Sequence, residues 1–243
     1  MGGELSTRLP EELAEKLRGY SSFRHPYDET EAEIHVLSHP SKPRLYLKTR
    51  QGDSGRLETE YLMLKWINQR VPTPEPLYYS KDGSTEYLVN TEITGTPTYQ
   101  VDASKRENAV KILALTLKQV HSLDVAGCPV LHSVDTWIKS LKEKGIDVSP
   151  LGDWRPVEKF EFTHGDYCLP NIIVRDGVLS GVIDWDYAGL ADPYVDLVSC
   201  IWSIRYNYGE EADKLIPFFL KTYGVELNQA KFDFYKRLNQ LIP

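Results

Sequence analysis

Apolar residues in the first part of the chain fall in short runs that predict two pairs of antiparallel strands. Residues 34–37 and 45–48 lie on either side of a segment rich in proline and serine, as the two strands of a hairpin do. Residues 77–79 and 87–89 flank the sequence Lys81-Asp82-Gly83-Ser84, whose composition is typical of a tight turn. We therefore expect this part of the chain to form a sheet built of hairpins.

Longer segments carry apolar residues every three or four positions, which predicts amphipathic helices. These helices are expected over residues 9–17, 56–70, 108–123 and 137–144. Beyond Pro193 the same spacing continues to the end of the chain, with Gly209 and Gly224 as breaks. The second part of the chain is therefore mostly helical.

One further hairpin is expected inside this helical part. Residues 172–174 and 178–183 are apolar and are joined by Asp176-Gly177, a sequence that favours a two-residue turn. A sheet-rich first part and a helix-rich second part predict an α+β fold with two lobes. We set the first lobe at residues 1–94 and the second at residues 95–243.

Composition excludes several classes of protein. The 243 residues carry a net charge of −7 and no block rich in Lys and Arg, so we expect no nucleic-acid partner. We expect no membrane partner either, because no apolar run approaches the roughly 20 residues of a spanning helix and residues 1–10 lack the apolar core of an export signal. Three cysteines without a C-x-x-C motif favour reduced thiols in the cytoplasm. The acidic balance suits a polycationic small molecule, although it also simply keeps a protein dispersed.

The candidate chemistry lies in one stretch of the second part. His164-Gly165-Asp166 is followed by Asn171, and Asp184 ends the strand after the predicted hairpin. Protein kinases place a catalytic Asp and a metal-binding Asn at this same separation, with another metal-binding Asp further on. Phosphoryl transfer requires an oriented hydroxyl group and cations that neutralise the phosphate oxygens, which a loop carboxylate and oxygen ligands for Mg²⁺ can supply. Asp and Asn also form ordinary turns, so the order of the whole group carries the prediction.

This order resembles the aminoglycoside phosphotransferase family, and its 3′-phosphotransferase branch most of all. The resemblance rests on residues 163–172 and 181–186, on Asp196, and on residues 200–211, and it extends forward to residues 45–48. It implies a protein-kinase-like two-lobed fold, with a small antiparallel-sheet N-lobe and a larger, mostly helical C-lobe. It also implies ATP or GTP as the phosphoryl donor, Mg²⁺ as cofactor and a cationic aminoglycoside as acceptor.

The family resemblance assigns roles to individual residues. Asp166 would be the catalytic base or hydroxyl-orienting residue, and Asn171 and Asp184 would hold Mg²⁺. Lys48 would contact the phosphates while paired with Glu60, which the resemblance favours over Glu58. Nucleotide contacts would also come from Thr91 and Ile93, in the hinge at residues 90–93, and from Thr30 in the covering loop. His164 and Asp196 would support the catalytic loop, and Asp186, Trp202 and Tyr206 would contact the acceptor.

Three other functions stay open on the sequence alone. A metabolic kinase of the same fold would act on choline, homoserine or a sugar. A catalytically silent binding module could keep the fold, and a metal hydrolase could use His164, Asp166 and Asp184. The covering loop, residues 28–33, is acidic and lacks the glycines of protein kinases. Residues 132–159 form a shorter segment than the acidic one typical of relatives that modify antibiotics, and the chain ends without the acidic and aromatic residues of the 3′ branch. Five acidic residues in the shorter segment remain as possible ammonium contacts: Asp135, Glu143, Asp147, Asp153 and Glu158.

Overall fold

The computed structural model describes residues 9–25, 32–52 and 55–242, and the chain divides into two compact units. The first unit is Met1–Gln69 with Thr73–Ile93, and the second is Arg70–Pro72 with Thr94–Pro243. Sheet and helices are both present in quantity, so the predicted α+β class is confirmed. No helix in the described ranges is long and apolar enough to cross a bilayer.

The first unit is built on a five-stranded antiparallel sheet in the order β1-β2-β3-β5-β4. Its elements are α1 (Glu11–Lys16), β1 (Ser21–Arg24), β2 (Ala32–Ser38), β3 (Leu45–Gln51), α2 (Arg56–Ile67), β4 (Pro76–Asp82) and β5 (Thr85–Thr91). Both predicted hairpins, β2–β3 and β4–β5, are confirmed, with Val36 opposite Tyr46 and Tyr79 opposite Leu88. Each strand extends by a few residues beyond the predicted apolar run.

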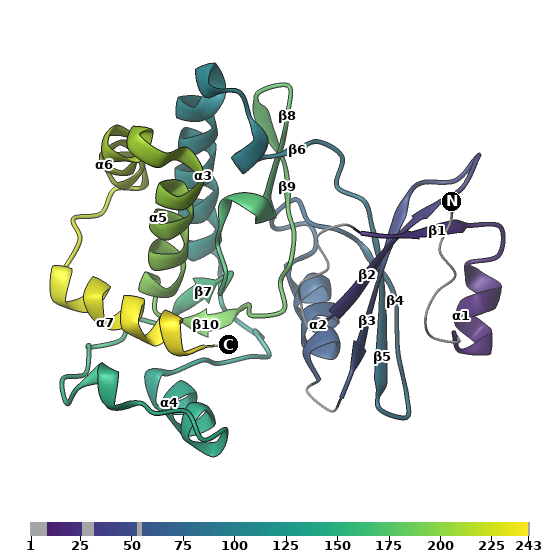
Figure 1. Ribbon diagram of the computed structural model, residues 1–243, viewed down its shortest axis with the longest axis horizontal. Helices are drawn as coiled ribbons and strands as arrows, with labels where there is room; N and C mark the ends of the chain where they lie inside the picture. The colour runs from purple at the N-terminus through teal and green to yellow at the C-terminus, as the bar shows by residue number, and fades with distance from the viewer. Residues whose placement is uncertain (1–8, 26–31, 53–54, 243) are drawn as a thin grey trace. The chain divides into compact units, whose positions relative to one another are not determined.

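Helices α1 and α2 cover opposite faces of this sheet (Figure 1). Leu13 of α1 packs with Leu45 and Leu47 of β3 in one buried cluster. Side chains alternate between the two faces of a strand, so Lys48 points to the other face, where α2 lies. The alternation of β3 therefore sets Lys48 against α2, while Leu45 and Leu47 face α1.

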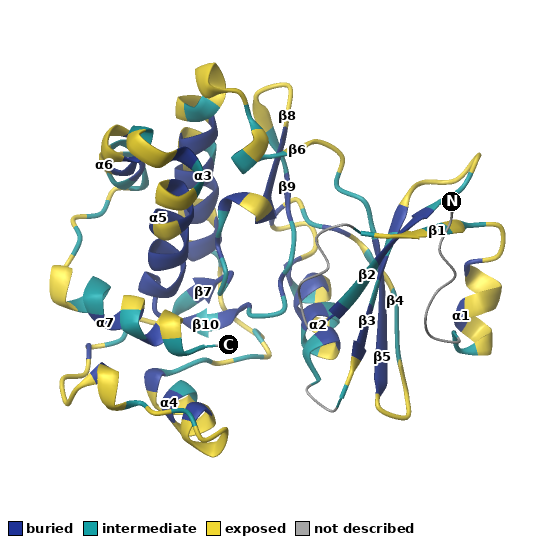
Figure 2. Ribbon diagram, viewed as in Figure 1, coloured by how far each residue is buried: buried dark blue, intermediate teal, exposed yellow. Residues whose placement is uncertain are grey.

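The second unit is dominated by helices, as predicted. They are α3 (Arg106–His121), α4 (Val134–Glu143), α5 (Tyr194–Tyr208), α6 (Ala212–Tyr223) and α7 (Gln229–Leu241). Gly209 and Gly224 end α5 and α6 at positive φ, which confirms both predicted breaks. Helix α5 packs against α6 and α7, and its N-terminal half is buried (Figure 2).

Short strands and single turns of 3₁₀-helix complete the second unit. The strands are β6 (Thr96–Pro97), β7 (Glu161–Thr163), β8 (Ile172–Arg175), β9 (Val178–Val182) and β10 (Gly189–Ala191). The 3₁₀ turns are Thr98–Gln100, Ala103–Lys105, Ser149–Leu151, Leu169–Asn171 and Gly209–Glu211. The predicted β8–β9 hairpin is confirmed, with Asp176 and Gly177 both at positive φ in its turn. Strand β10 pairs with β7, so the segments before and after this hairpin are also joined.

Candidate active site

The segment that follows β7 is held from inside the second unit by Asp196. This aspartate lies in the first turn of α5 and is fully buried. Its Oδ2 accepts the backbone N–H of His164 at 2.8 Å, and its Oδ1 accepts the N–H of Gly165 at 2.8 Å. A buried carboxylate is stable only when its oxygens are hydrogen-bonded, and here the donors are the loop amides themselves. Asp196 therefore sets the position of the backbone immediately before Asp166.

Glycine is required at position 165 by both conformation and space. Gly165 has φ +86°, in the left-handed region, and a Cβ built on it would lie 2.2 Å from the backbone oxygen of Tyr187. This close approach brings the loop after β7 against the segment that leads into β10. A larger residue here would push the two segments apart.

The imidazole of His164 is buried and is engaged at both nitrogens. Its Nε2 lies 2.9 Å from the Ile183 carbonyl oxygen, and its Nδ1 lies 3.3 Å from the backbone nitrogen of Asp166. The ring also packs against Trp185, with centroids 4.5 Å apart. A carbonyl can only accept, so Nε2 carries the hydrogen and Nδ1 accepts. These contacts favour a structural role for His164, tying the loop to the end of β9.

The carboxylate of Asp166 is hydrogen-bonded on one oxygen. Its Oδ2 faces Nδ2 of Asn171 at 3.3 Å and the thiol of Cys168 at 3.6 Å. Among the described residues no donor is directed at Oδ1. Oδ1 is therefore the oxygen of Asp166 that can accept a hydrogen bond from a bound hydroxyl group.

Burial raises the pKa of the Asp166 carboxyl group above its usual range. His164 acts in the opposite direction, the Asp184 carboxylate raises the pKa further, and the hydrogen bond from Cys168 lowers it. Asp184 acts in this direction because its negative charge disfavours a second negative charge on Asp166. Such a pair is favourable for binding a cation, which would neutralise both.

Asn171 and Asp184 are brought together by the β8–β9 hairpin. The backbone N–H of Ile183 donates to the Asn171 carbonyl oxygen at 2.9 Å, and Asp184 follows with φ +69°, an unusual conformation for a residue other than glycine. The Asn171 amide donates to the Asp166 carbonyl oxygen at 3.0 Å, so its Nδ2 faces Asp166. Its Oδ1 receives no hydrogen bond from the described residues.

This donor set fits Mg²⁺ but not a metal held by protein groups alone. One amide oxygen and one carboxylate are hard oxygen ligands, and Mg²⁺ usually takes few protein ligands and completes its shell with water and phosphate oxygens. In the described part of the chain, no group of three or more His, Cys, Asp or Glu side chains is arranged to hold a metal ion. The third candidate from the sequence, a hydrolase with a protein-bound metal, has no ligand cluster to support it there.

Lys48 and Glu60 form the predicted ion pair within the first unit. The Lys48 ammonium lies 2.8 Å from both carboxylate oxygens of Glu60, which is 1% exposed. Glu58 is exposed, and its backbone N–H donates to a carboxylate oxygen of Glu86. The pairing is confirmed, while contact with phosphates stays a prediction.

The two residues predicted to contact the nucleotide after β5 differ in whether their backbone N–H is free to bind a ligand. Thr91 exchanges hydrogen bonds with Glu75, through its N–H at 3.0 Å and its hydroxyl oxygen at 2.8 Å. The backbone N–H of Ile93 has no acceptor among the described residues and can donate to a ligand. Thr30 lies outside the described residues.

The predicted acceptor contacts include an exposed aromatic pair on α5. Trp202 is 59% exposed and Tyr206 74%, and their rings stack with centroids 5.0 Å apart. Between them along the helix, Ser203 accepts the backbone N–H of Leu169 at 3.0 Å, which connects this turn of α5 to the segment after Asp166. Asp186 is partly buried after β9. Contact of these three side chains with an acceptor stays a prediction.

Two side chains at this site make contacts that the sequence did not predict. Cys168 has no catalytic partner in the sequence, yet its thiol is directed at Asp166, and burial raises its pKa far above the usual range. His121, at the end of α3, lies 3.0 Å from the Asp196 carboxylate. His121 is 75 positions from Asp196 along the chain, and its place near the apolar face of a helix gave no signal of this contact.

Comparison with known proteins identifies the family. The model of the phosphotransferase enzyme family, to which the aminoglycoside phosphotransferases belong, matches residues 29–144 and 151–232. The chain belongs to this family. The match covers the Lys48–Glu60 pair and the whole Asp166, Asn171 and Asp184 group.

Named relatives and solved aminoglycoside phosphotransferase structures are similar to this chain over most of its length. An aminoglycoside 3′-phosphotransferase of Niallia circulans is 31% identical over 98% of both chains. The crystal structure of an aminoglycoside-3′-phosphotransferase of type VIII superposes with a TM-score of 0.82 at 22% identity, over 95% of this chain and 97% of the other. An aminoglycoside phosphotransferase of Streptomyces rimosus, in complex with ADP and streptomycin, gives a TM-score of 0.72 at 22% identity over 88% and 94%. The predicted kinase-like two-lobed fold of this family is confirmed.

Proposed function

We propose that the protein transfers the γ-phosphoryl group of ATP or GTP to a hydroxyl group of an aminoglycoside and thereby confers resistance to the antibiotic. The 3′-hydroxyl is the acceptor that the name of the Niallia circulans relative gives. One observation carries the proposal: Asp166 and Asn171 are hydrogen-bonded to one another beside Asp184, in a chain of the phosphotransferase enzyme family. The protein's three free cysteines support action in the reducing cytoplasm.

Asp166 is the residue that orients and deprotonates the acceptor hydroxyl group. Its Oδ1 accepts the hydroxyl hydrogen, while Asn171 and Cys168 hold Oδ2. The backbone of Asp166 is also held, because its carbonyl oxygen accepts from Asn171 and its N–H donates to His164. The acceptor oxygen is therefore held in line with the phosphorus atom. Positioning of this kind accounts for most of the catalysis in phosphoryl transfer.

Asn171 and Asp184 would hold Mg²⁺ through Oδ1 of the amide and through the carboxylate. When bound, Mg²⁺ neutralises negative charge on the phosphate oxygens. The tie between Ile183 and the Asn171 carbonyl sets the separation of the two ligands, and Nδ2 of Asn171 stays on Asp166. The same asparagine therefore links the metal position to the catalytic carboxylate.

The nucleotide contacts of the first unit follow from its hydrogen bonds. Lys48, whose orientation is fixed by Glu60, supplies a positive charge for the phosphates. The N–H of Ile93 donates to the nucleobase, and the carbonyl oxygen of Thr91 accepts a hydrogen bond from the nucleobase. The N–H of Thr91 already donates to the Glu75 carbonyl oxygen, and its hydroxyl oxygen accepts the Glu75 N–H. The preference between ATP and GTP would follow from this pair of backbone groups.

The test is an acceptor panel combined with two aspartate variants. We expect Mg²⁺-dependent turnover of ATP or GTP that kanamycin or neomycin stimulates, with the product phosphorylated on a hydroxyl group. Asp166→Ala should lower kcat by at least about 1,000-fold while nucleotide binding survives, and the exposed Asp82→Ala should match the wild type. Absence of stimulation by every aminoglycoside contradicts the substrate, and an active Asp166→Ala variant contradicts the mechanism.

A second candidate, a kinase for a quaternary ammonium alcohol such as choline, is favoured by one observation. The exposed, stacked rings of Trp202 and Tyr206 offer aromatic faces to a cation, and aromatic side chains bind quaternary ammonium groups by cation–π attraction. Choline is therefore included in the panel. Turnover stimulated by choline and by no aminoglycoside would establish this second function in place of the first.

A further inference from the structure

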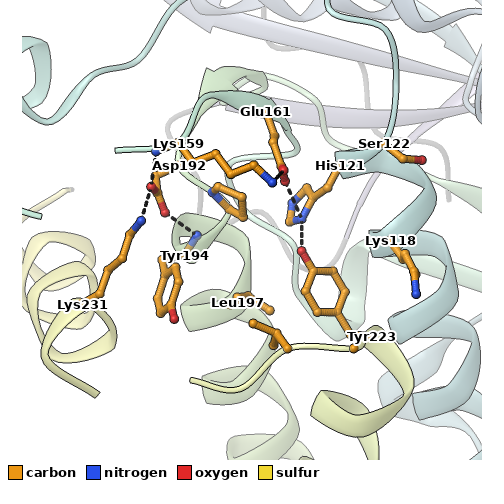
Figure 3. A pocket seen from close by; sticks show the side chains of 13 residues that line it. Lys118, His121, Ser122, Lys159, Glu161, Asp192, Tyr194, Leu197, Tyr223 and Lys231 are labelled. Atoms are coloured by element: carbon orange, nitrogen blue, oxygen red, sulfur yellow. Dashed lines mark hydrogen bonds and ion pairs between the residues drawn. The ribbon is translucent and has the colours of Figure 1, made fainter. Parts of the chain in front are cut away.

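His121, the last residue of α3, lies in the wall of a cavity of about 420 Å³ in the second unit (Figure 3). Its imidazole is buried and engaged at both nitrogens. Nδ1 lies 2.7 Å from the hydroxyl oxygen of Tyr223, and Nε2 lies 3.0 Å from Oδ2 of Asp196. His121 therefore bridges the end of α6 and the first turn of α5.

The partners of His121 define the direction of both hydrogen bonds. Oδ2 of Asp196 already accepts the backbone N–H of His164, and a carboxylate oxygen can only accept. The hydrogen of the imidazole is therefore on Nε2. In the neutral imidazole Nδ1 is then the acceptor, and the Tyr223 hydroxyl group donates to it. The result is a directed chain from Tyr223 through His121 to Asp196.

This chain continues into the catalytic loop. The two oxygens of Asp196 accept the backbone N–H groups of His164 and Gly165, each at 2.8 Å. The donor from His121 is a third hydrogen bond to the same fully buried carboxylate. Without the His121 donor this buried carboxylate would keep only the two loop amides as donors, which is costly and weakens the hold on its orientation. Rotation of that side chain would release the loop amides that precede Asp166.

Four of the five Lys, Asp and Glu side chains that line the cavity are paired with one another. Asp192 accepts the ammonium of Lys231 at 2.5 Å, and Glu161 pairs with Lys159. Oε2 of Glu161 lies 4.0 Å from Nδ1 of His121, beyond hydrogen-bond distance. Tyr223 and Asp196 are therefore the two hydrogen-bond partners of the His121 side chain.

We propose that His121 is a positioning residue for phosphoryl transfer. It holds the Asp196 carboxylate in the orientation that fixes the backbone before Asp166, and Tyr223 contributes by holding His121. Neither side chain touches the reacting atoms. This inference rests on the proposed function for its kinetic consequences, but the order of the loop can be measured without any substrate.

The kinetic test uses four variants and one matched control. His121→Phe keeps a planar ring and removes both hydrogen bonds, and we expect kcat to fall by about 10- to 100-fold with nucleotide KM within about 2-fold, as for a misplaced catalytic group. Tyr223→Phe should lower kcat by about 2- to 5-fold, close to the value of a single hydrogen bond. His121→Gln, whose amide can donate to Asp196, should recover part of the activity. The control is Tyr235→Phe, because the Tyr235 hydroxyl is buried and has no hydrogen-bond partner among the described residues.

The double variant His121→Phe/Tyr223→Phe separates a directed chain from two independent packing effects. Since Tyr223 acts through His121, we expect the double variant to have the kcat of His121→Phe alone. Additive losses would overturn the proposal. A rise in nucleotide KM with unchanged kcat, or full activity of His121→Phe, would also overturn it. If His121→Phe does not fold, Tyr223→Phe and His121→Gln decide the question by the same comparison of kcat with KM.

Amide hydrogen exchange tests the same contact without turnover. Exchange across residues 163–166 should be faster in His121→Phe than in the wild type and unchanged in Tyr235→Phe, because the Asp196 carboxylate protects the His164 and Gly165 amides. Unchanged exchange in His121→Phe contradicts the proposal. If the wild type phosphorylates no aminoglycoside, the proposed function fails while the exchange result still decides the role of His121.

Discussion

The Lys48 ammonium group lies 2.8 Å from both carboxylate oxygens of Glu60 and joins β3 to α2. A lysine held in this way presents its charge in one direction. We expect Lys48→Ala to lower kcat/KM for the nucleotide by about 100-fold, because the proposed function places this preorganised charge at the phosphates. Steady-state kinetics with varied ATP checks this, with the exposed Lys65→Ala on α2 as the control. Equal effects of the two substitutions would contradict the assignment of Lys48.

The same ion pair predicts a stability signature that is independent of catalysis. Glu60 is almost fully buried, and removal of one partner of such a pair costs about 3–5 kcal/mol, whereas an apolar replacement of both is often nearly neutral. Lys48→Met should therefore destabilise the protein strongly, and Lys48→Met/Glu60→Leu should recover most of the loss. Urea unfolding of the four proteins of the cycle measures this. A double variant less stable than Lys48→Met would show that the pair contributes in another way.

Gly165→Ala should disturb both folding and activity. The added Cβ would lie 2.2 Å from the Tyr187 backbone oxygen, so the two segments must separate. Gly145→Ala is a matched control, since Gly145 also has positive φ (+74°) but nothing within 4 Å of the added Cβ. The control should lose about 1 kcal/mol from backbone strain alone, and Gly165→Ala should lose more and have little activity. Similar melting temperatures for the two variants would argue against close approach at Tyr187.

Trp202 and Tyr206 should affect the acceptor and not the nucleotide. An aromatic face beside a cation contributes about 0.5–2 kcal/mol, so Trp202→Ala should raise the acceptor KM by about 3- to 10-fold, with nucleotide KM unchanged. Tyr206→Ala should act in the same direction, because its ring supports that of Trp202. Leu115→Ala on α3 is the control, as it also removes an exposed apolar side chain from the second unit. An unchanged acceptor KM in both aromatic variants would remove this face from the binding site.

His132 predicts a loss of stability in mild acid. Burial lowers the pKa of its imidazole, while a hydrogen bond with the Ala188 carbonyl acts in the opposite direction. The unfolded chain, with an ordinary histidine pKa of about 6.5, binds the proton more readily than the folded state. The contribution is therefore fully present above that pH and is lost as the pH falls through the lower folded-state value. His132→Phe, which can keep the stacking on Trp137, should gain stability relative to the wild type as thermal unfolding is followed from about pH 7.5 to 5.5. Parallel curves would exclude this titration.

Local patterns were sufficient to predict most elements of the fold. The short apolar runs at residues 34–37 and 45–48, separated by a segment rich in proline and serine, predicted β2 and β3, and the Asp176-Gly177 turn predicted the β8–β9 hairpin. The pairing of β7 with β10 was missed because each strand has three residues, too few for a period to be visible, and because their partners are far apart in the chain. Strand β6, with two residues, was missed for the same reason.

The site divides in a similar way between what the sequence carries and what only the fold provides. The order of Asp166, Asn171 and Asp184 was readable because a loop and one hairpin bring them together locally. Selection of Glu60 over Glu58 came from the family resemblance, since the two residues lie on different faces of the helix and the sequence alone does not show which face meets Lys48. The contact of His121 with Asp196 depends on the packing of α3 against the start of α5, which no local pattern records.

Helix α5 separates two requirements along a single rigid rod. Its buried first turn carries Asp196, whose bonds hold the loop before Asp166, and its later turns present Trp202 and Tyr206 to solvent. Amino-acid substitutions at the solvent-facing positions do not alter the Asp196 carboxylate or the groups that donate hydrogen bonds to it. Under the proposed function, substitutions in the outer turns of this one helix would change which acceptor binds, while the residues that position Asp166 stay the same.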